Sequence, residues 1–351
     1  MSKRGSKTAL CGEKPPKTQK KTKSRTVKTT ATTPSGKAKR AASQKRRAEL
    51  AEKGLFKSQG SEWTLIPDAQ RNEFITLLAG LIHSAEDLTQ ARYRNDMWAA
   101  AKHDPKAAGK EKKLRVVALD CEMVTIAPKQ AKEGGDDEQQ QQQQYGFWTR
   151  NGNEREHLVQ LCVVDVLTGT TIIDTAVKPP VGWEVTDWRT RYSGMSAGRF
   201  ARYQSASRCV GGVLKAREMV LNLINKETIL VGHSMNHDLN ILEISHKRVV
   251  DTQIVTRKAV AAKAMDPVRR YSLKELCLEL LGRTLQTGHG KSGHNCVEDV
   301  LAPREIVIWW LKEENQGVRE AWIRKKVAEA AAAESAGESS SEPSHDLSGY
   351  L

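Results

Sequence analysis

From about residue 114 onward, short runs of apolar residues alternate with longer segments whose apolar residues recur every three or four positions. The first pattern is typical of buried strands and the second of amphipathic helices. Three consecutive strands come first and strand–helix alternation follows, which favours an α/β fold with a mixed five-stranded sheet flanked by helices. The predicted strands span residues 114–123, 157–167, 170–178, 228–233 and 248–254, and the predicted helices about 206–225, 236–246, 272–281 and 297–313.

A helical extension is predicted before these strands, at residues 61–110. Pro67 can open its first helix, because the first turn of a helix needs no N–H from that residue. The apolar stripe of this helix comprises Phe74, Leu77, Leu78, Leu81 and Ile82, and a second stretch, about 85–101, carries Leu88, Tyr93, Met97 and Trp98. We expect both helices to pack against the domain that follows. Recognition of RNA or of a partner is the alternative, although the spacing does not require it.

Positive charge is concentrated at the start of the chain. Residues 1–47 contain 16 Lys and Arg and one acid, a net charge of +15, whereas the whole chain carries +14. A segment so rich in charge and so poor in apolar residues cannot bury enough surface to fold. We therefore expect residues 1–60 to form a disordered basic tail.

Two basic clusters lie within this tail, at residues 37–40 and 45–47. Such clusters are typical of nuclear-import signals, and they also bind phosphates through salt-sensitive attraction. They predict recognition by a nuclear import receptor and localisation to the nucleus, with the nucleolus left open. A solubilising tail with no specific reader is the alternative.

The remaining chain consists of two predicted parts. Residues 111–315 form the predicted α/β domain, and residues 316–351 form an Ala/Glu/Ser-rich tail that we expect to be helical and then disordered. The α/β domain contains an insertion at 125–156 with a glutamine run, which is typical of a surface loop. Stacking of RNA bases on the aromatic residues at its exit is the alternative.

The six cysteines form no Cys-x-x-Cys pair, and no apolar run is long enough to span a bilayer. We expect a reduced compartment, no signal peptide and no membrane association. Nothing in the pattern constrains the oligomeric state.

Four carboxylates and one imidazole stand where predicted strands or helices meet loops: Asp120, Glu122, Asp238, His294 and Asp299. Asp120 and Glu122 should face the same side of the sheet, since side chains in a strand repeat every two residues. Carboxylate oxygens are the ligands that Mg²⁺ and Mn²⁺ prefer. Two such ions can activate a water molecule and stabilise the leaving oxygen in phosphodiester cleavage. The set predicts a nuclease with two Mg²⁺ or Mn²⁺ ions.

Each of these residues also has a purely structural interpretation. The acids could belong to a solvated strand edge or to the first turns of helices, where the helix dipole favours them, and His294 could bind a backbone carbonyl. The co-occurrence of all five favours the functional interpretation. Pro303 is less favourable, because a proline four residues after Asp299 predicts a helix that starts late or bends and so displaces Asp299.

Six segments between residues 114 and 312 carry a resemblance to a known family: ALDCEMV at 118–124, VKP at 177–179, TRYSG at 190–194, VGHS at 231–234, VVDT at 249–252 and GHNCVED at 293–299. They resemble the DEDDh class of 3′→5′ exonucleases, and within it the Rex-type eukaryotic RNA exonucleases. His294 lies five residues before Asp299, as the "h" subclass requires. The tyrosine subclass would have a tyrosine at the position of Asn295.

The resemblance implies a ribonuclease H-like exonuclease fold in which Asp120, Glu122, Asp238 and Asp299 bind metal and His294 is the general base. It also implies substrate contacts by Met123, His233 and Ser234. The implied activity is metal-dependent trimming of RNA 3′ ends with release of nucleoside 5′-monophosphates.

Two alternatives to this activity stay open. A DNA exonuclease of the same class is one, because no residue visibly reads a 2′-hydroxyl. A noncatalytic nuclear RNA-binding or assembly factor is the other, supported only by Pro303. Ribosomal, small nuclear, 5S and transfer RNA precursors are all compatible substrates.

Overall fold

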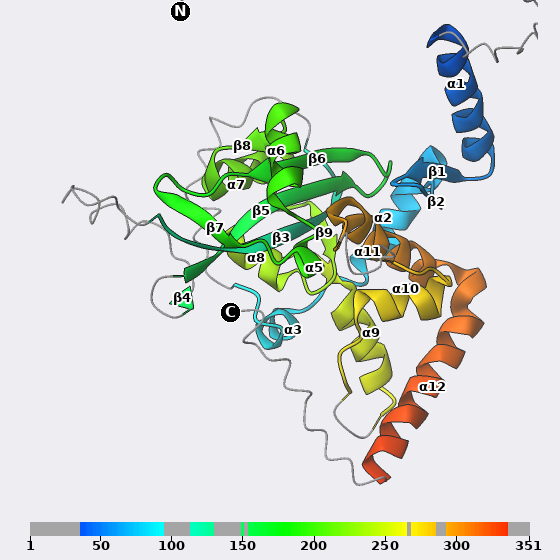
Figure 1. The fold of residues 1–351 in the computed structure, drawn as a ribbon. Helices are drawn as coiled ribbons and strands as arrows, with labels where there is room; N and C mark the ends of the chain where they lie inside the picture. Colours follow the sequence, from blue (N-terminus) through cyan, green and yellow to red (C-terminus); the bar gives the residue numbers. More distant parts are fainter. Residues whose placement is uncertain are drawn as a thin grey trace, which may run out of the picture. The chain divides into compact units, whose positions relative to one another are not determined.

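The computed structural model describes residues 36–94, 113–129, 149–150, 154–264, 268–285 and 293–335. Its main feature is a mixed sheet whose central path runs in the order β10-β9-β3-β5-β6-β8, of which Figure 1 labels β9, β3, β5, β6 and β8. Antiparallel pairs join β3 (Val116–Pro128) to β5 (Glu154–Asp165) and β5 to β6 (Thr171–Val177). On the other side of β3, the parallel strands β9 (Ile229–Gly232) and β10 (Val249–Asp251) extend the sheet. The expected mixed α/β sheet is confirmed.

In the described part of the chain the sheet has eight strands, whereas five were predicted. The additional strands are β4 (Thr149–Arg150), β7 (Trp183–Asp187) and β8 (Cys209–Val210). Two of them are only two residues long and leave no apolar pattern, and β7 pairs with the far end of β3 without burying any of its own residues. The predicted insertion loop is therefore too long at both ends, since residues 125–128 and 154–156 belong to β3 and β5. Its glutamine run lies outside the described residues.

Alternate residues of β3 enter two different hydrophobic cores, as the two-residue repeat of a strand requires. Val116 and Ala118 belong to one core, and Val117 and Leu119 belong to the other. The first core is completed by helices α9 (Thr252–Ala261), α10 (Leu273–Leu281) and α11 (Cys296–Leu311), and the second by α7 (Gly212–Leu223) and α8 (Asn236–Ile241). The strand that carries Asp120 and Glu122 is therefore held from both faces.

Helix α11 runs without interruption through Pro303, so the predicted late start or displacement is wrong. The helix begins at Cys296, and Asp299 lies buried in its first turn. The proline removes one backbone donor from the helix. Burial of Pro303 and of nearly every residue around it holds the helix in place, and buried Arg304 donates from Nε to the carbonyl oxygen of Val166 at 2.8 Å. The packing of these buried residues therefore outweighs the unfavourable effect of a proline inside a helix.

The extension begins with a β-hairpin and not with a helix. Strands β1 (Leu55–Ser58) and β2 (Ser61–Thr64) pair antiparallel through Gln59 and Gly60, both of which have positive φ. The helical parts follow as a 3₁₀ turn (Asp68–Gln70) directly after Pro67, then α2 (Arg71–Ala79) and α3 (Ala85–Gln90). Met97 and Trp98 of the predicted second helix lie outside the described residues.

The predicted disordered tail at residues 1–60 also contains ordered elements. Helix α1 spans Gly36–Glu52, a segment rich in Ala, Lys, Arg and Glu, all of which have high helix propensity. Strand β1 is ordered by its pairing with β2, in which Trp63 is buried and donates from Nε1 to the carbonyl oxygen of Ser58 at 3.1 Å. Residues 1–35 lie outside the described part of the chain.

Helix α12 (Gln316–Ser335) occupies the start of the C-terminal segment that the sequence predicts to be helical. Trp322 and Ile323 are buried against the first core, and Lys326 pairs with Glu279. Among the described residues, no helix combines the length and the apolar character needed to cross a bilayer.

Candidate active site

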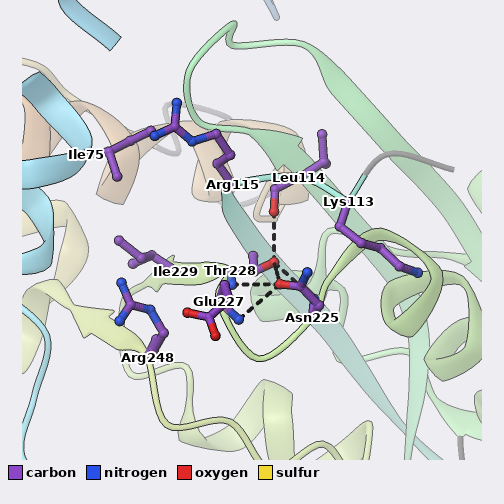
Figure 2. A pocket seen from close by; sticks show the side chains of 9 residues that line it. All are labelled: Ile75, Lys113, Leu114, Arg115, Asn225, Glu227, Thr228, Ile229 and Arg248. Carbon is purple, nitrogen blue, oxygen red and sulfur yellow. Dashed lines mark hydrogen bonds between the residues drawn. The ribbon is translucent and has the colours of Figure 1, made fainter. Parts of the chain in front are cut away.

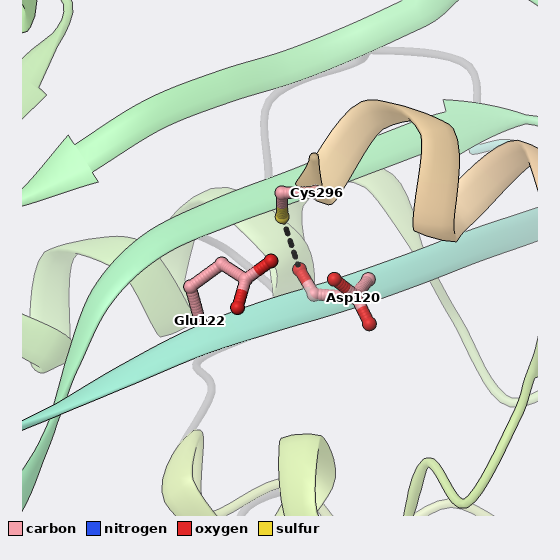
Figure 3. A group of neighbouring side chains, drawn as sticks. All are labelled: Asp120, Glu122 and Cys296. Carbon is pink, nitrogen blue, oxygen red and sulfur yellow. Dashed lines mark hydrogen bonds between the residues drawn. The ribbon is translucent and has the colours of Figure 1, made fainter. Parts of the chain in front are cut away.

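Asp120 and Glu122 project from the middle of β3 on the side facing the start of α11 (Figure 3). Glu122 is buried and Asp120 is half-buried. One carboxylate oxygen of each residue and the thiol of Cys296 lie within 4.8 Å of one another. The two acids therefore converge as their spacing along a strand predicts.

His294 and Asp299 are brought to Glu122 by the loop before α11 and by its first turn. One ligand atom from each of these three residues lies within 4.8 Å of the other two. The distance from Nδ1 of His294 to Oδ2 of Asp299 is 3.5 Å, and the histidine side chain keeps 35% of its surface exposed while Asp299 is buried. An imidazole that faces both the acids and solvent is placed to exchange protons at this site.

Asp238 approaches the same place from the other helix layer. It lies in the first turn of α8, and its Oδ1 accepts a 2.7 Å hydrogen bond from the backbone N–H of Cys121, the residue between Asp120 and Glu122. This bond fixes α8 to the centre of β3. The structure thus brings together all five residues that the sequence singles out, with Asp238 joined through the backbone of β3.

The acids strongly perturb one another. Burial and the carboxylates of Asp238 and Asp299 raise the pKa of Asp120 well above its usual value. Burial and the carboxylate of Asp120 do the same to the pKa of Glu122. Burial also raises the pKa of Asp238 to about 7, although the N–H of Cys121 opposes the shift. A cation among these groups would favour their ionised forms and offset the repulsion.

The donor set fits hard divalent cations. Carboxylate oxygens predominate, and Oε1 of buried Glu122 has no hydrogen-bond partner among the described residues. A buried carboxylate oxygen is costly to leave without a partner, so an ion is the natural one.

Two glycines hold the backbone on either side of His294, a feature that sequence reasoning did not identify. Gly293 and Gly194 both have positive φ. A Cβ on Gly293 would lie 1.9 Å from the carbonyl oxygen of Thr190, and a Cβ on Gly194 would lie 1.9 Å from that of His294. The short helix α5 (Thr190–Ser193) and the loop of His294 are therefore in direct backbone contact. The signal was present in the segment TRYSG, but its partner is about 100 residues away.

The three predicted substrate-binding residues lie on the two elements that carry acids of the site, at β3 and at the loop leading to α8. Met123 follows Glu122 at a register shift of β3 and is half-buried. His233 and Ser234 form the loop between β9 and α8, where Nδ1 of His233 lies 2.9 Å from Oγ1 of Thr252 and Ser234 has positive φ. Both loop residues stabilise this turn, His233 through Thr252 and Ser234 through its backbone N–H, which donates to Asp251. Their contact with substrate stays a prediction.

Asp251 organises the same loop, and the sequence did not single it out as a site residue. It is buried, and its carboxylate accepts the backbone N–H groups of Ser234 and Met235 at 3.0 and 3.2 Å. Its Oδ2 also accepts a 2.6 Å hydrogen bond from the hydroxyl of Tyr93. The extension thus contacts the residue that shapes the turn leading to Asp238.

A cavity of about 270 Å³ lies at the opposite ends of the parallel strands (Figure 2). Its lining includes Lys113, Arg115 and Arg248, which precede β3 and β10. Nζ of Lys113 donates to the carbonyl oxygen of Asn222 at 2.7 Å, and Arg115 donates to Oδ1 of Asn72 at 2.6 Å. Glu227 is the one acid among its lining residues, so this cavity lacks the cluster of carboxylates found beside His294.

The sequence profile of the exonuclease (RNase_T) family matches residues 117–306. RNA exonuclease 3 of Candida albicans is 30% identical over 208 residues, which cover 59% of this chain and 40% of that protein. Small RNA degrading nuclease 2 of Arabidopsis thaliana is 32% identical over 205 residues, covering 56% of this chain and 34% of that protein. The chain therefore spans less than half the length of these relatives.

Solved structures with partial similarity include the Pan2 catalytic unit of Neurospora crassa, with protease and nuclease domains. The TM-score is 0.44 and the identity 17%, over 68% of this chain and 34% of that chain.

Proposed function

Because the chain belongs to the exonuclease (RNase_T) family, we propose that it is a 3′→5′ exoribonuclease that trims RNA 3′ ends and releases nucleoside 5′-monophosphates. Its fold is the ribonuclease H-like exonuclease fold expected from the sequence. The observation that carries the proposal is the convergence of the site residues on Glu122. Ligand atoms of Glu122, His294 and Asp299 lie within 4.8 Å of one another, a carboxylate oxygen of Asp120 lies within 4.8 Å of one of Glu122, and Asp238 is fixed to the same strand.

The four acids would hold two Mg²⁺ or Mn²⁺ ions. Their oxygens suit these hard cations. Burial, and for Asp120 and Glu122 also the neighbouring carboxylates, raises the pKa of Asp120, Glu122 and Asp238, and a bound cation would favour the ionised forms. When bound, such ions acidify an attacking water and stabilise the leaving oxygen.

His294 is the proposed general base. Burial and the positive charge of Lys274 lower its pKa, so the imidazole is neutral at physiological pH and can accept a proton. The buried carboxylate of Asp299, 3.5 Å from Nδ1, orients the ring and stabilises the imidazolium once it forms.

RNA is the proposed substrate because the relatives in Candida and Arabidopsis are named as nucleases of RNA. The basic segment at residues 1–47 would add salt-dependent attraction to the phosphate backbone. The alternative of a noncatalytic RNA-binding factor was supported only by Pro303. That support is lost, because α11 continues through Pro303 and Asp299 stays in its first turn.

The direct test incubates the full chain with RNA and DNA oligonucleotides of the same sequence, labelled at either end, with Mg²⁺ or EDTA. We expect 3′-labelled RNA to release labelled mononucleotide at once and 5′-labelled RNA to shorten progressively. Asp120→Asn should abolish both, and Asp68→Asn, the same change at an exposed acid outside the site, should not. Faster digestion of DNA would identify the DNA exonuclease, and binding without shortening would refute the enzyme.

Nuclear localisation is part of the same proposal. Lys45, Arg46 and Arg47 are exposed on helix α1, as a segment read by an import receptor must be. Replacing these three residues by glutamine in a fluorescent fusion should disperse the protein into the cytoplasm. The control replaces Lys20, Lys21 and Lys23 by glutamine, which removes the same amount of charge and should leave the protein in the nucleus. Unchanged nuclear accumulation of the first variant would reject this signal.

A further inference from the structure

The thiol of Cys296 lies inside the candidate metal site. Cys296 is the first residue of α11 and is buried, and its Sγ donates to the backbone carbonyl oxygen of Asp120 at 3.4 Å. In Figure 3 the sulfur points from the start of α11 toward the strand that carries Asp120 and Glu122. Sγ and one carboxylate oxygen of each acid lie within 4.8 Å of one another, which is close enough to share one ion.

The neighbouring carboxylate is free to bind an ion. Oε1 of Glu122 is buried and has no hydrogen-bond partner among the described residues, and the side chain is only 6% exposed. The thiol's own bond to a carbonyl oxygen is a weak one, so exchanging it for a bond to a metal costs little. The site therefore offers two carboxylates and one sulfur.

This donor set differs in kind from one made only of oxygen. Carboxylates select Mg²⁺, Ca²⁺ and Mn²⁺, whereas a thiolate selects softer ions such as Zn²⁺. Zn²⁺ accepts mixed sulfur and oxygen ligands. Sulfur at this position should shift the preference of the site toward thiophilic cations.

We propose that Asp120, Glu122 and Cys296 form a site for a thiophilic divalent cation of the Zn²⁺ class, which competes with Mg²⁺ or Mn²⁺ for the same carboxylates and inhibits trimming. Binding replaces the S–H bond by a metal–sulfur bond and releases one proton to solvent, with no change of oxidation state. The competition rests on the proposed function, whereas the binding does not.

The test of binding uses Cd²⁺ as the probe and needs no RNA. Chelator-treated full-length protein is titrated with Cd²⁺, and the ultraviolet charge-transfer absorption of a cadmium–thiolate bond is recorded. Cys11 and Cys209 are first replaced by alanine, since Cys209 is half-exposed at the far edge of the sheet and Cys11 lies in the basic tail. We expect absorption that saturates near one equivalent of Cd²⁺ and is lost in Cys296→Ser, which keeps the size of the side chain.

Two outcomes would overturn the proposal. The first is a lack of charge-transfer absorption in the parent protein. The second is absorption that persists in Cys296→Ser and is lost in Cys162→Ser, because Cys162 is the hydrogen-bond neighbour of Cys296 and is also buried. Circular dichroism and thermal unfolding of each variant establish that the fold is intact before the titration is read.

The test of competition measures Zn²⁺ inhibition at fixed Mg²⁺, with each variant normalised to its own rate without Zn²⁺. Loss of an outer partner of a metal ligand typically costs about 10–100-fold in affinity, so loss of a ligand should raise the inhibitory Zn²⁺ concentration at least about tenfold in Cys296→Ser. Unchanged inhibition would refute the competition. If the parent protein does not trim RNA at all, the proposed function fails while the Cd²⁺ titration still decides the site.

Discussion

The hydroxyl of Tyr93 donates a 2.6 Å hydrogen bond to the carboxylate of Asp251, 158 residues away in the sequence. Both groups are buried. Asp251 also accepts the backbone N–H groups of Ser234 and Met235, which shape the turn leading to Asp238. Tyr93 thereby connects the extension before the catalytic domain to the helix that carries one of the site's acids.

Tyr93→Phe should weaken both the fold and the activity. A hydrogen bond to a buried charged group contributes about 1.5–3 kcal/mol, and we expect a loss of that size in the free energy of unfolding. Displacement of α8 should lower kcat by roughly tenfold to a hundredfold with a smaller effect on KM. Urea unfolding and steady-state kinetics measure the two effects.

Lys258→Ala is the matched control for this variant. Lys258 joins the same extension to α9 through Asp87, but its ammonium is largely exposed and does not contact Asp251. Such a pair contributes about 0.2–1 kcal/mol. Equal losses of activity in both variants would mean that Tyr93 acts only by docking the extension.

The metal-free protein should lose stability as the pH rises, because of its buried acids. The pKa of Asp238 is raised to about 7 in the folded state, so folding takes up a proton between about pH 4 and 7 and the free energy of unfolding falls across this window. Histidines such as His157, whose pKa is lowered to about 4 by burial, act in the opposite direction. The free energy of unfolding of the wild type is therefore compared with that of Asp238→Asn in EDTA. The histidines are present in both proteins, so their effect cancels.

In urea unfolding, we expect the free energy of unfolding of the wild type to fall relative to that of Asp238→Asn between pH 4 and pH 7. Adding Mg²⁺ should reduce or reverse it, since a bound cation favours the ionised carboxylates. A difference that does not vary with pH would contradict the raised pKa of Asp238.

Lys274 should set the acidic limb of the pH–rate profile. A general base acts in its neutral form, so the rate rises with pH through the pKa of His294 and then levels off. Burial and then Lys274 lower that pKa. Lys274→Gln should therefore raise the pKa and move the acidic limb to higher pH, with a smaller shift at high salt.

Lys215→Gln, which removes an exposed lysine from α7, is the control for this experiment. His294→Ala should lower kcat and remove the limb altogether. A profile that is the same in the wild type and in both His294→Ala and Lys274→Gln would exclude His294 as the base.

Gly293→Ala should be far more damaging than Gly282→Ala. Both glycines have φ near +60°, so both variants carry the strain of a left-handed backbone, about 1–2 kcal/mol. Only the Cβ at residue 293 would also meet backbone atoms, at 1.9 Å from the carbonyl oxygen of Thr190, whereas the space around Gly282 is open.

We expect Gly293→Ala to lose more than about 4 kcal/mol or to displace the loop of His294 and lose most of its activity. Thermal unfolding and kcat distinguish these two results from each other. Similar behaviour of the two variants would show that the loop relaxes away from α5.

The sequence predicted the parts of the site that follow from short periodicities. Asp120 and Glu122 converge because a strand repeats every two residues, and Asp299 lies in a first helical turn, as the helix predicted at about 297–313 implies. The central strands were predicted because each contains a short apolar run rich in Val, Ile and Leu. These features depend on near neighbours in the chain.

Other features could not be predicted because they depend on contacts between distant segments. The turn at Gln59 and Gly60 was missed, since glutamine is not typical of a tight hairpin. Asp251 was placed in a strand that was expected to continue to residue 254, but its side chain accepts the N–H of Gln253 and starts α9. The bond from Tyr93 to Asp251 leaves no local pattern at either residue.

The extension supplies apolar side chains to both faces of the sheet: Trp63, Phe74 and Leu78 enter the core beneath α11, and Leu88 and Tyr93 enter the one beneath α8. A truncation at residue 111, where the apolar pattern alone would start the domain, would uncover both. The smallest fragment worth expressing therefore starts before Leu55, and an inactive shorter product would report a damaged scaffold and not the chemistry of the acids.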